Sequence, residues 1–177
     1  RFSKTGKVSC STCHEREKAF TDEKVVSQGI DDLKGTRNAP TVINAAYMET
    51  QFWDGREPSL EEQSAQPFVN PVEMGLENHD PILKIIREDS SYVAAFKEVF
   101  GVKADEITMK EVKQAIGSFE RTIISGDSPF DRYQYGNDKS AMSPAAIRGL
   151  EVFVNQGRCV SCHIIEQTQA LFTDNKF

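Results

Sequence analysis

The motif Cys10-Ser11-Thr12-Cys13-His14 recurs near the other end of the chain as Cys159-Val160-Ser161-Cys162-His163. The two copies use all four cysteines of the chain and two of its three histidines. Cys-x-x-Cys-His is the attachment motif of c-type haem. The two thiols bind the haem covalently, and the imidazole becomes an axial ligand of its iron. The sequence therefore predicts two covalently bound c-type haems, one at each motif.

Other uses of paired cysteines explain the two motifs less well. A Cys-x-x-Cys redox site usually accompanies a β–α–β pattern, and the sequence shows no such pattern. A structural zinc site joins two pairs across roughly 15–20 residues, whereas Cys13 and Cys159 are much further apart. A long-range zinc site is the alternative that this spacing leaves open. Two disulfides would leave the histidine after each pair without a role.

Composition and charge define the broad class. The chain has 177 residues, 38% hydrophobic and 27% charged, as in an ordinary globular protein. No apolar run approaches the roughly 18 residues of a membrane span, and there is no secretory signal. A net charge of −6 argues against nucleic acid as a partner and suits a basic or dipolar redox protein. Because c-type haem is attached outside the cytoplasm, we expect a periplasmic protein and a mature or trimmed chain.

The periodicity of apolar residues predicts helices and no strand of useful length, so the expected fold class is all-α. Capping boxes and cap–proline pairs mark the helix starts. The expected helices are Leu60 to Ala65, one from Asp80, one from Ser90 to a stop at Gly101, one from Thr108 that includes Ile123, and one from Ser143 into the second motif. The segment from Ser125 to Ser140 is expected to be a polar turn. The core is expected to hold Ile82, Ile85, Ile86, Val112, Ile116 and Phe119.

Each haem motif is expected to lie in a domain of its own. A boundary near Ser140 divides the chain into residues 1–140, an N-terminal haem domain, and residues 141–177, the start of a second. The predicted architecture is therefore two cytochrome c-like haem domains. The second motif is followed by few residues, so we expect its domain to be incomplete in this chain.

Three segments of the middle region are specific in sequence: Arg37-Asn38-Ala39-Pro40-Thr41, Phe52-Trp53-Asp54-Gly55-Arg56, and Gln66-Pro67-Phe68-Val69-Asn70-Pro71-Val72-Glu73-Met74. Together with the haem motifs, in this order and spacing, the chain resembles the bacterial dihaem cytochrome c peroxidase family. That family includes the methylamine-dehydrogenase maturation enzymes. The resemblance spans essentially the whole chain.

The resemblance implies a role for each haem. The haem on Cys10, Cys13 and His14 would be the site where hydrogen peroxide is reduced to water. Its distal pocket would be formed by Gln63, Pro67 and Glu73. The haem on Cys159, Cys162 and His163 would receive electrons from a small donor, either a c-type cytochrome or a copper protein. Trp53 matches the tryptophan between the two haems, and Asn38 matches a ligand of a calcium ion. A homodimer is one option for the assembly.

The residue types suit these roles. A carboxylate such as Glu73 can move a proton from one peroxide oxygen to the other, which is typically worth roughly 10²–10⁴ in rate. An amide such as Gln63 does not titrate but can orient peroxide by donating a hydrogen bond. Taken singly, each residue has a simpler interpretation. Trp53 would anchor a core, Glu73 would be solvated, Gln63 would lie on an exposed helix face, and Asn38 would form a turn.

Residues 25–35 contain no histidine and no methionine, although many family peroxidases have a histidine in this loop that binds the peroxidatic iron. His79, the one spare histidine, stands at an expected helix cap. We therefore expect His14 to be the only protein ligand of its iron. That iron would be open to peroxide without prior reduction of the second haem.

Two alternatives follow from the same residues. The maturation enzymes also lack the loop histidine and oxidise a partner protein through high-valent iron. They tend to have tryptophan where this chain has Gly157, which favours the peroxidase. The second alternative is a plain dihaem electron carrier with two six-coordinate irons. Met48, Met74, Met109 and Met142 keep histidine–methionine ligation open, but a carrier gives the Gln63–Pro67–Glu73 pocket no purpose.

Overall fold

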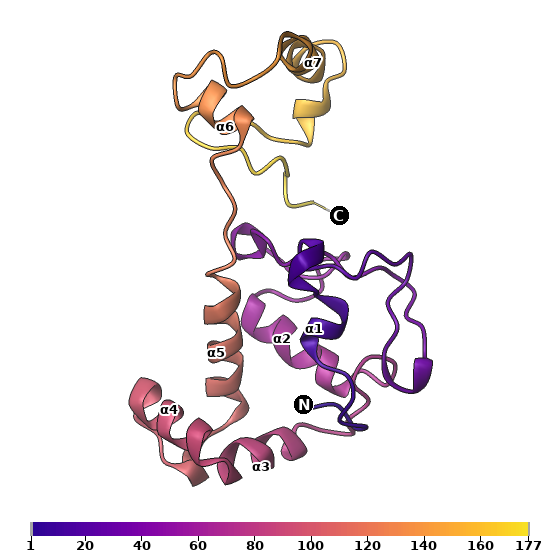
Figure 1. Ribbon diagram of the computed structural model, residues 1–177, viewed down its shortest axis with the longest axis vertical. Coiled ribbons are helices and arrows are strands. Elements are labelled where there is room, and N and C mark those ends of the chain that lie inside the picture. Colours follow the sequence, from indigo (N-terminus) through magenta and orange to yellow (C-terminus); the bar gives the residue numbers. More distant parts are fainter. Residues whose placement is uncertain (1, 177) are drawn as a thin grey trace. The chain divides into compact units, whose positions relative to one another are not determined.

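The computed structural model describes residues 2–176, and within that range it contains helices and no strand (Figure 1). Three isolated antiparallel bridges close short loops, at Glu15–Thr21, Gln28–Lys34 and Gln51–Glu57. The all-α prediction is confirmed. The chain divides into two compact units, Arg1–Ile124 and Ser125–Phe177. The two compact units meet at Ile124 and Ser125, and the predicted domain boundary near Ser140 stays a prediction.

The first haem motif forms a single helical turn at the start of the first unit. Helix α1 spans Cys10–Cys13. The next stretch is loop, as its glycines and prolines indicate, with short 3₁₀ turns η1 Arg16–Lys18, η2 Ile30–Asp32 and η3 Ala45–Tyr47. No described helix of the chain is long and apolar enough to cross a membrane.

Helix α2 spans Leu60–Val69 and is longer than the expected Leu60 to Ala65. Its start is as predicted, because the Ser59 hydroxyl accepts a hydrogen bond from the Glu62 amide at 3.2 Å. Pro67 lies inside the helix and lacks an amide hydrogen, yet the helix continues to Val69. The carbonyl of Pro67 accepts a hydrogen bond from the Met74 amide at 3.2 Å. This bond holds the turn that follows α2 against the end of the helix.

The remaining helices of the first unit are α3 Asp80–Glu88, α4 Ser90–Phe100 and α5 Met109–Glu120, with the 3₁₀ turn η4 Ala104–Glu106 between the last two. The Thr108–Glu111 capping box is present at the start of α5. Gly101 ends α4 in the left-handed conformation, with φ 71°. Helix α5 ends at Glu120, so the expectation that it includes Ile123 was wrong.

A hydrophobic core holds the first unit together. Its most buried side chains are Phe68 of α2, Ile82 and Ile86 of α3, and Ile107. Helices α2 and α5 pack against each other. Two predicted core residues, Ile85 and Phe119, are exposed. Ile82 and Ile86 are four residues apart and share one face of α3, while Ile85 is turned to the side of it.

The second unit contains helix α6 Pro129–Gln134, helix α7 Pro144–Val154 and the 3₁₀ turn η5 Cys159–Ser161 (Figure 1). Helix α6 falls inside the segment expected to be a polar turn, so that expectation was wrong. Its capping box joins Ser128 to Asp131, and Pro129 occupies its first turn. The Ser143 cap of α7 was predicted correctly, and its hydroxyl accepts the Ala146 amide at 3.2 Å.

Candidate functional site

The first haem motif presents its histidine in a defined tautomer. Nδ1 of His14 lies 3.0 Å from the carbonyl oxygen of Phe20. A carbonyl oxygen only accepts, so Nδ1 carries the hydrogen and donates it. The lone pair of Nε2 is then available for a metal, as in metal-bound histidines whose other nitrogen is held by a carbonyl. The His14 amide also donates to the Cys10 carbonyl at 2.9 Å, which fixes the imidazole to the helical turn.

The second motif repeats this arrangement. Nδ1 of His163 lies 2.8 Å from the carbonyl oxygen of Phe172, and the His163 amide donates to the Cys159 carbonyl at 2.9 Å. All four cysteines are free thiols. Each motif therefore offers two sulfurs and one imidazole with a free Nε2, which is the set of groups that a c-type haem requires.

Glu73 lies close enough to the first motif to interact with it electrostatically. Burial raises the pKa of Glu73, and the positive charge of Arg56 acts in the opposite direction. The pKa of the Cys13 thiol is raised by burial and by the negative charges of Asp22 and Glu73. One Glu73 oxygen accepts a hydrogen bond from the Asn70 side-chain amide at 2.8 Å. The side chain is thus half-buried, held in place, and near both Cys13 and His14.

A glycine allows the Glu73 turn to reach the loop that follows the motif. The Ile30 amide donates to the carbonyls of Val72 and Glu73, at 3.2 and 3.0 Å. A Cβ added at Gly29 would overlap the Val72 carbonyl oxygen and lie 2.7 Å from Cα of Glu73. A side chain at position 29 would therefore push the carboxylate turn away from the motif.

The other two predicted pocket residues lie on α2. Gln63 and Pro67 are four residues apart and share a face of this helix. Both are half-buried. The bond from the Met74 amide to the Pro67 carbonyl links this part of α2 to the turn that carries Glu73. The structure thus places Glu73 near the motif. The helix that carries Gln63 and Pro67 is connected to the Glu73 turn by this backbone hydrogen bond.

Trp53 and Asn38 are in contact with each other. The Trp53 indole donates from Nε1 to the Asn38 carbonyl at 3.1 Å, and 53% of the Trp53 side chain is exposed. The two segments are also joined by Asp54, which pairs with Arg37 and Arg56 at 2.8 Å each. These two guanidinium groups lower the pKa of Asp54 to about 2. The simpler interpretation of Trp53 as a core anchor does not hold within its unit.

Calcium at Asn38 is a prediction that the structure does not test. Asn38 lines a hollow of about 350 Å³ together with Asp22 and Lys24. Within residues 2–176 there is no cluster of three acidic, histidine or cysteine side chains suited to a metal ion.

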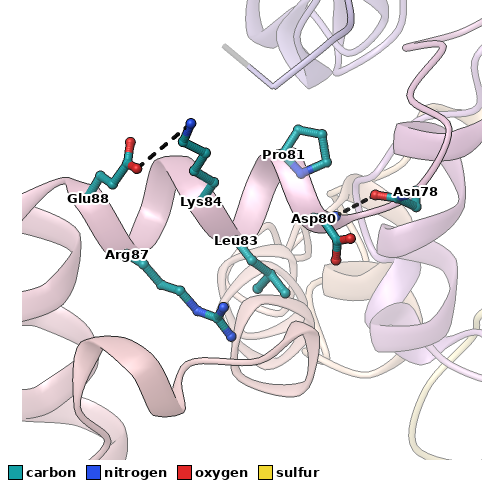
Figure 2. A pocket seen from close by; sticks show the side chains of 7 residues that line it. All are labelled: Asn78, Asp80, Pro81, Leu83, Lys84, Arg87 and Glu88. Carbon is teal, nitrogen blue, oxygen red and sulfur yellow. Dashed lines mark hydrogen bonds and ion pairs between the residues drawn. The ribbon is translucent and has the colours of Figure 1, made fainter.

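A larger hollow, of about 680 Å³, runs along α3 and contains none of the predicted site residues (Figure 2). Its rim carries the Lys84–Glu88 ion pair at 4.0 Å. The lining residues are Asn78, Asp80, Pro81, Leu83, Lys84, Arg87 and Glu88. His79, at the adjacent cap position, uses Nε2 to donate to the Ala65 carbonyl at 3.0 Å. That bond ties the spare histidine to α2, whereas the helix-capping side-chain hydrogen bond that the sequence suggested is not formed.

Sequence reasoning missed two buried carboxyl groups near the first motif. Asp22 is 3% exposed, and its Oδ2 has no hydrogen-bond partner in the described part of the chain. Oε2 of Glu120 is likewise buried and without a partner there. Both negative charges act on motif cysteines, Asp22 on Cys13 and Glu120 on Cys10. No local sequence pattern indicates that Asp22 would be buried near the motif. Glu120 stands at the end of an amphipathic helix, where a carboxylate is usually solvated.

These features agree with a known class of haem proteins. Residues 1–139 match the sequence profile of the di-haem cytochrome c peroxidase family. The chain belongs to this family, so the predicted resemblance is confirmed and haem is its implied cofactor.

Relatives and solved structures support the same assignment. Cytochrome c551 peroxidase of Nitrosomonas europaea is 39% identical over 163 residues, which cover 92% of this chain and 47% of the relative. Methylamine utilization protein MauG of Methylophilus methylotrophus is 34% identical over 179 residues, covering 100% of this chain and 51% of the relative. The crystal structure of a MauG-like protein associated with microbial copper homeostasis is 30% identical, with a TM-score of 0.82 over 99% of this chain and 51% of that one. The chain spans about half the length of the curated relatives it matches.

Proposed function

We propose that this chain carries the peroxide site of a periplasmic di-haem peroxidase. The reaction is H₂O₂ + 2e⁻ + 2H⁺ → 2H₂O. The haem bound covalently through Cys10 and Cys13 and ligated by His14 would supply the redox-active iron that binds peroxide. The haem at Cys159, Cys162 and His163 would receive electrons from a small c-type cytochrome or copper protein. The observation that carries the proposal is the half-buried Glu73 carboxyl beside the His14 motif.

Glu73 is the acid–base group of this proposal. A group that takes a proton from one peroxide oxygen and returns it to the other works best with a pKa near the working pH. Burial raises the pKa of Glu73 above its ordinary value, and the bond from Asn70 holds one carboxylate oxygen in place. Gln63 would donate a hydrogen bond that orients peroxide, and Pro67 would shape the wall beside it. The exposed indole of Trp53 suits an electron path to the second haem.

The test replaces Glu73 with Gln in the full-length haem-loaded protein. Glu73→Gln keeps the shape of the side chain and removes its proton exchange, so turnover should fall by ~10² or more while haem spectra stay nearly intact. Glu77→Gln is the matched control, because Glu77 is an exposed carboxylate on the same loop. Unchanged turnover in Glu73→Gln would remove this residue from the mechanism.

The state of the His14 iron can be tested separately. His14 has no second histidine or methionine in residues 25–35 to share its iron. The fully oxidised protein should therefore show a high-spin ferric electron paramagnetic resonance signal beside a low-spin one. Two low-spin signals would contradict the open site, and would favour a reductively activated peroxidase or an electron carrier.

A second function, oxidation of a partner protein, is favoured by the similarity to MauG over the full chain. The surroundings of Gly157 favour the peroxidase. A Cβ at this position would lie 3.0 Å from the Val152 carbonyl oxygen and 3.2 Å from Sγ of Cys159. A side chain here, such as the tryptophan typical of the maturation enzymes, would require these neighbours to shift by a few tenths of an ångström. Measuring peroxide consumption with a reduced small cytochrome, and with a protein substrate in its place, distinguishes the two functions.

The proposal has three further parts. The haems are covalently attached, so they should stay with the polypeptide in denaturing gel electrophoresis. A calcium ion binds at Asn38, where chelation should lower turnover and added calcium should restore it. Residues 1–140 and 141–177 belong to different haem domains. The protein assembles as a monomer or as a homodimer.

A further inference from the structure

A second short motif follows each haem motif, and the proposed reaction does not use it. The sequence Phe-Thr-Asp occurs twice in the chain, at residues 20–22 and 172–174. The first copy begins six residues after His14, and the second begins nine residues after His163. The loops that lead to the two copies therefore differ in length, and they also differ in sequence. We call these segments the first and second Phe-Thr-Asp turns.

Both turns are joined to the histidine of their motif by the same pair of hydrogen bonds. In the first turn, the carbonyl of Phe20 accepts the Nδ1 hydrogen of His14 at 3.0 Å. In the second, the carbonyl of Phe172 accepts that of His163 at 2.8 Å. In the other direction, each Phe amide donates to the carbonyl of the residue directly after the histidine, at 2.9 Å in the first turn and 3.2 Å in the second. Two loops of different length thus end in one arrangement, which indicates that the arrangement is a property of the Phe-Thr-Asp turn.

The backbone of both turns is strained at the residue whose carbonyl meets the imidazole. Phe20 has a φ of 58° and Phe172 a φ of 55°, in the left-handed region that bulky residues rarely adopt. The position three residues later is left-handed as well, with φ 56° at Glu23 and 54° at Asn175. Such strain persists only where surrounding contacts hold it, and it is concentrated at functional sites. The strained residue contributes the same group in each turn, a carbonyl bonded to the histidine of the motif.

The threonine and the aspartate supply contacts that hold each turn. The hydroxyl of each threonine accepts a hydrogen bond from the amide two residues further on, at 3.3 Å for Thr21 and 3.0 Å for Thr173. One carboxylate oxygen of each aspartate accepts in the same way, at 3.1 Å for Asp22 and 3.2 Å for Asp174. Side chains of this type fix the backbone of tight turns. The same two residue types therefore hold the same conformation beside both histidines.

From this geometry we infer that the Phe-Thr-Asp turn is the second part of each haem-ligand site, and that its threonine and aspartate are positioning residues for the histidine. They act through the Phe carbonyl, which holds the imidazole in one tautomer and one orientation. A carbonyl that accepts the Nδ1 hydrogen raises the basicity of Nε2, the atom that would bind the iron. A more basic ligand stabilises ferric relative to ferrous iron and so lowers the reduction potential. The inference rests on haem binding at both motifs, as proposed above, and it requires neither peroxide chemistry nor Glu73.

The experiment is a potentiometric titration of the full-length, haem-loaded protein, in which the absorbance of the His163 haem is followed. Thr173→Val removes the hydroxyl with little change of shape, so the reduction potential of this haem should move to more positive values. Thr173→Ser keeps a hydroxyl and should stay at the unmodified value. A turn with a purely structural role would leave the potential in place in both variants, even where stability falls, and that result would overturn the inference.

The aspartate separates the hydrogen bond from the charge. Asp174→Ala should move the potential in the positive direction, whereas Asp174→Asn keeps an oxygen acceptor and should leave the potential near the unmodified value. Equal shifts in these two variants would assign the effect to the lost charge and contradict the positioning role. The matched control is Asp138→Ala, because Asp138 accepts the Ser140 amide at 3.0 Å in a turn of the same unit that follows no haem motif. This control should not move the potential.

A further measurement needs no variant and covers both motifs. In the hyperfine-shifted proton NMR spectrum of the oxidised protein, the Nδ1 hydrogens of His14 and His163 should persist in deuterium oxide, because carbonyl groups hold them. Their immediate loss would refute the inference. Thr21→Val should speed the exchange of the His14 hydrogen alone. Unchanged turnover in Glu73→Gln would remove the proposed acid–base group without altering these results, so the two proposals can fail independently.

Discussion

The two compact units carry nearly the same haem motif but stabilise it differently. The first, Arg1–Ile124, has its own hydrophobic core, with Phe68, Ile82, Ile86 and Ile107 among its most buried side chains. In the second, no described residue from 125 to 176 is buried. Its framework is a cluster of aromatic contacts in which the Phe172 ring meets Phe130 at 5.1 Å and Phe153 at 6.0 Å.

The difference shows that a short motif does not decide how its surroundings fold. In the first unit, haem would bind a body that already buries apolar side chains without it. In the second, no apolar residue of α7 is fully buried by the part of the chain that the structure describes. We expect haem bound at the second motif to add to that burial, because burial of apolar area is the main stabilising contribution to folding.

The largest expected effect is a difference in cooperative unfolding between the two units when each is isolated without haem. A haem-free peptide of residues 2–124 should be helical and unfold cooperatively, whereas a haem-free peptide of residues 125–176 should not. Far-ultraviolet circular dichroism during thermal unfolding measures both. A cooperative transition in the shorter peptide would show that its aromatic cluster is a sufficient core.

The next effect concerns pH and the first unit. Glu120 has its pKa raised from its ordinary 4.5 to about 7 by burial, so the folded haem-free unit keeps a proton that the unfolded chain releases. Its stability should therefore be unaffected by this group below about pH 4.5, and should fall as pH rises through the window up to about 7. The loss is on the order of 2 to 3 kcal/mol once solvent screening of this half-buried group is counted. Urea unfolding at several pH values measures it, and Glu120→Gln should remove the dependence.

A matched pair of valines sharpens the comparison. Val112 in α5 is 4% exposed, and Val152 in α7 is 50% exposed. In the haem-free chain, Val112→Ala should lower the free energy of unfolding by about 2 kcal/mol through lost burial and a cavity. Val152→Ala should change it by less than about 0.5 kcal/mol. Equal losses would indicate that α7 is packed as well as α5.

The smallest effect comes from the helix caps. Thr108→Ala removes a hydroxyl that accepts the Lys110 amide and bonds to Glu111, and should cost about 1 kcal/mol. Ser143→Ala removes the equivalent cap of α7. In the haem-free chain it should leave the measured unfolding transition in place, because α7 does not contribute to that transition. A shift of the transition by Ser143→Ala would show that the two units unfold together.

Local sequence signals predicted most of the helices. The Ser59, Thr108 and Ser143 caps and the Gly101 stop are where the patterns indicated, because these features depend on residues within one turn of each other. Helix α6 was missed although Ser128, Pro129 and Asp131 form a recognisable start, since its polar surroundings resembled a loop. The extension of α2 through Pro67 was not predictable from local rules, which disfavour proline inside a helix.

The sequence by itself determined the two haem motifs, the family and the all-α class, because attachment motifs and capping patterns are local. Only the tertiary structure showed that His14 and His163 both donate from Nδ1 to a carbonyl of the loop that follows the motif, and so keep Nε2 free. Only the packing of α2 on α5 showed that Arg121 pairs with Glu61 and leaves Glu120 unpaired. The physical reason is that tautomer, burial and the choice of ion-pair partner depend on which atoms meet across the fold, and spacing along the chain does not specify those meetings.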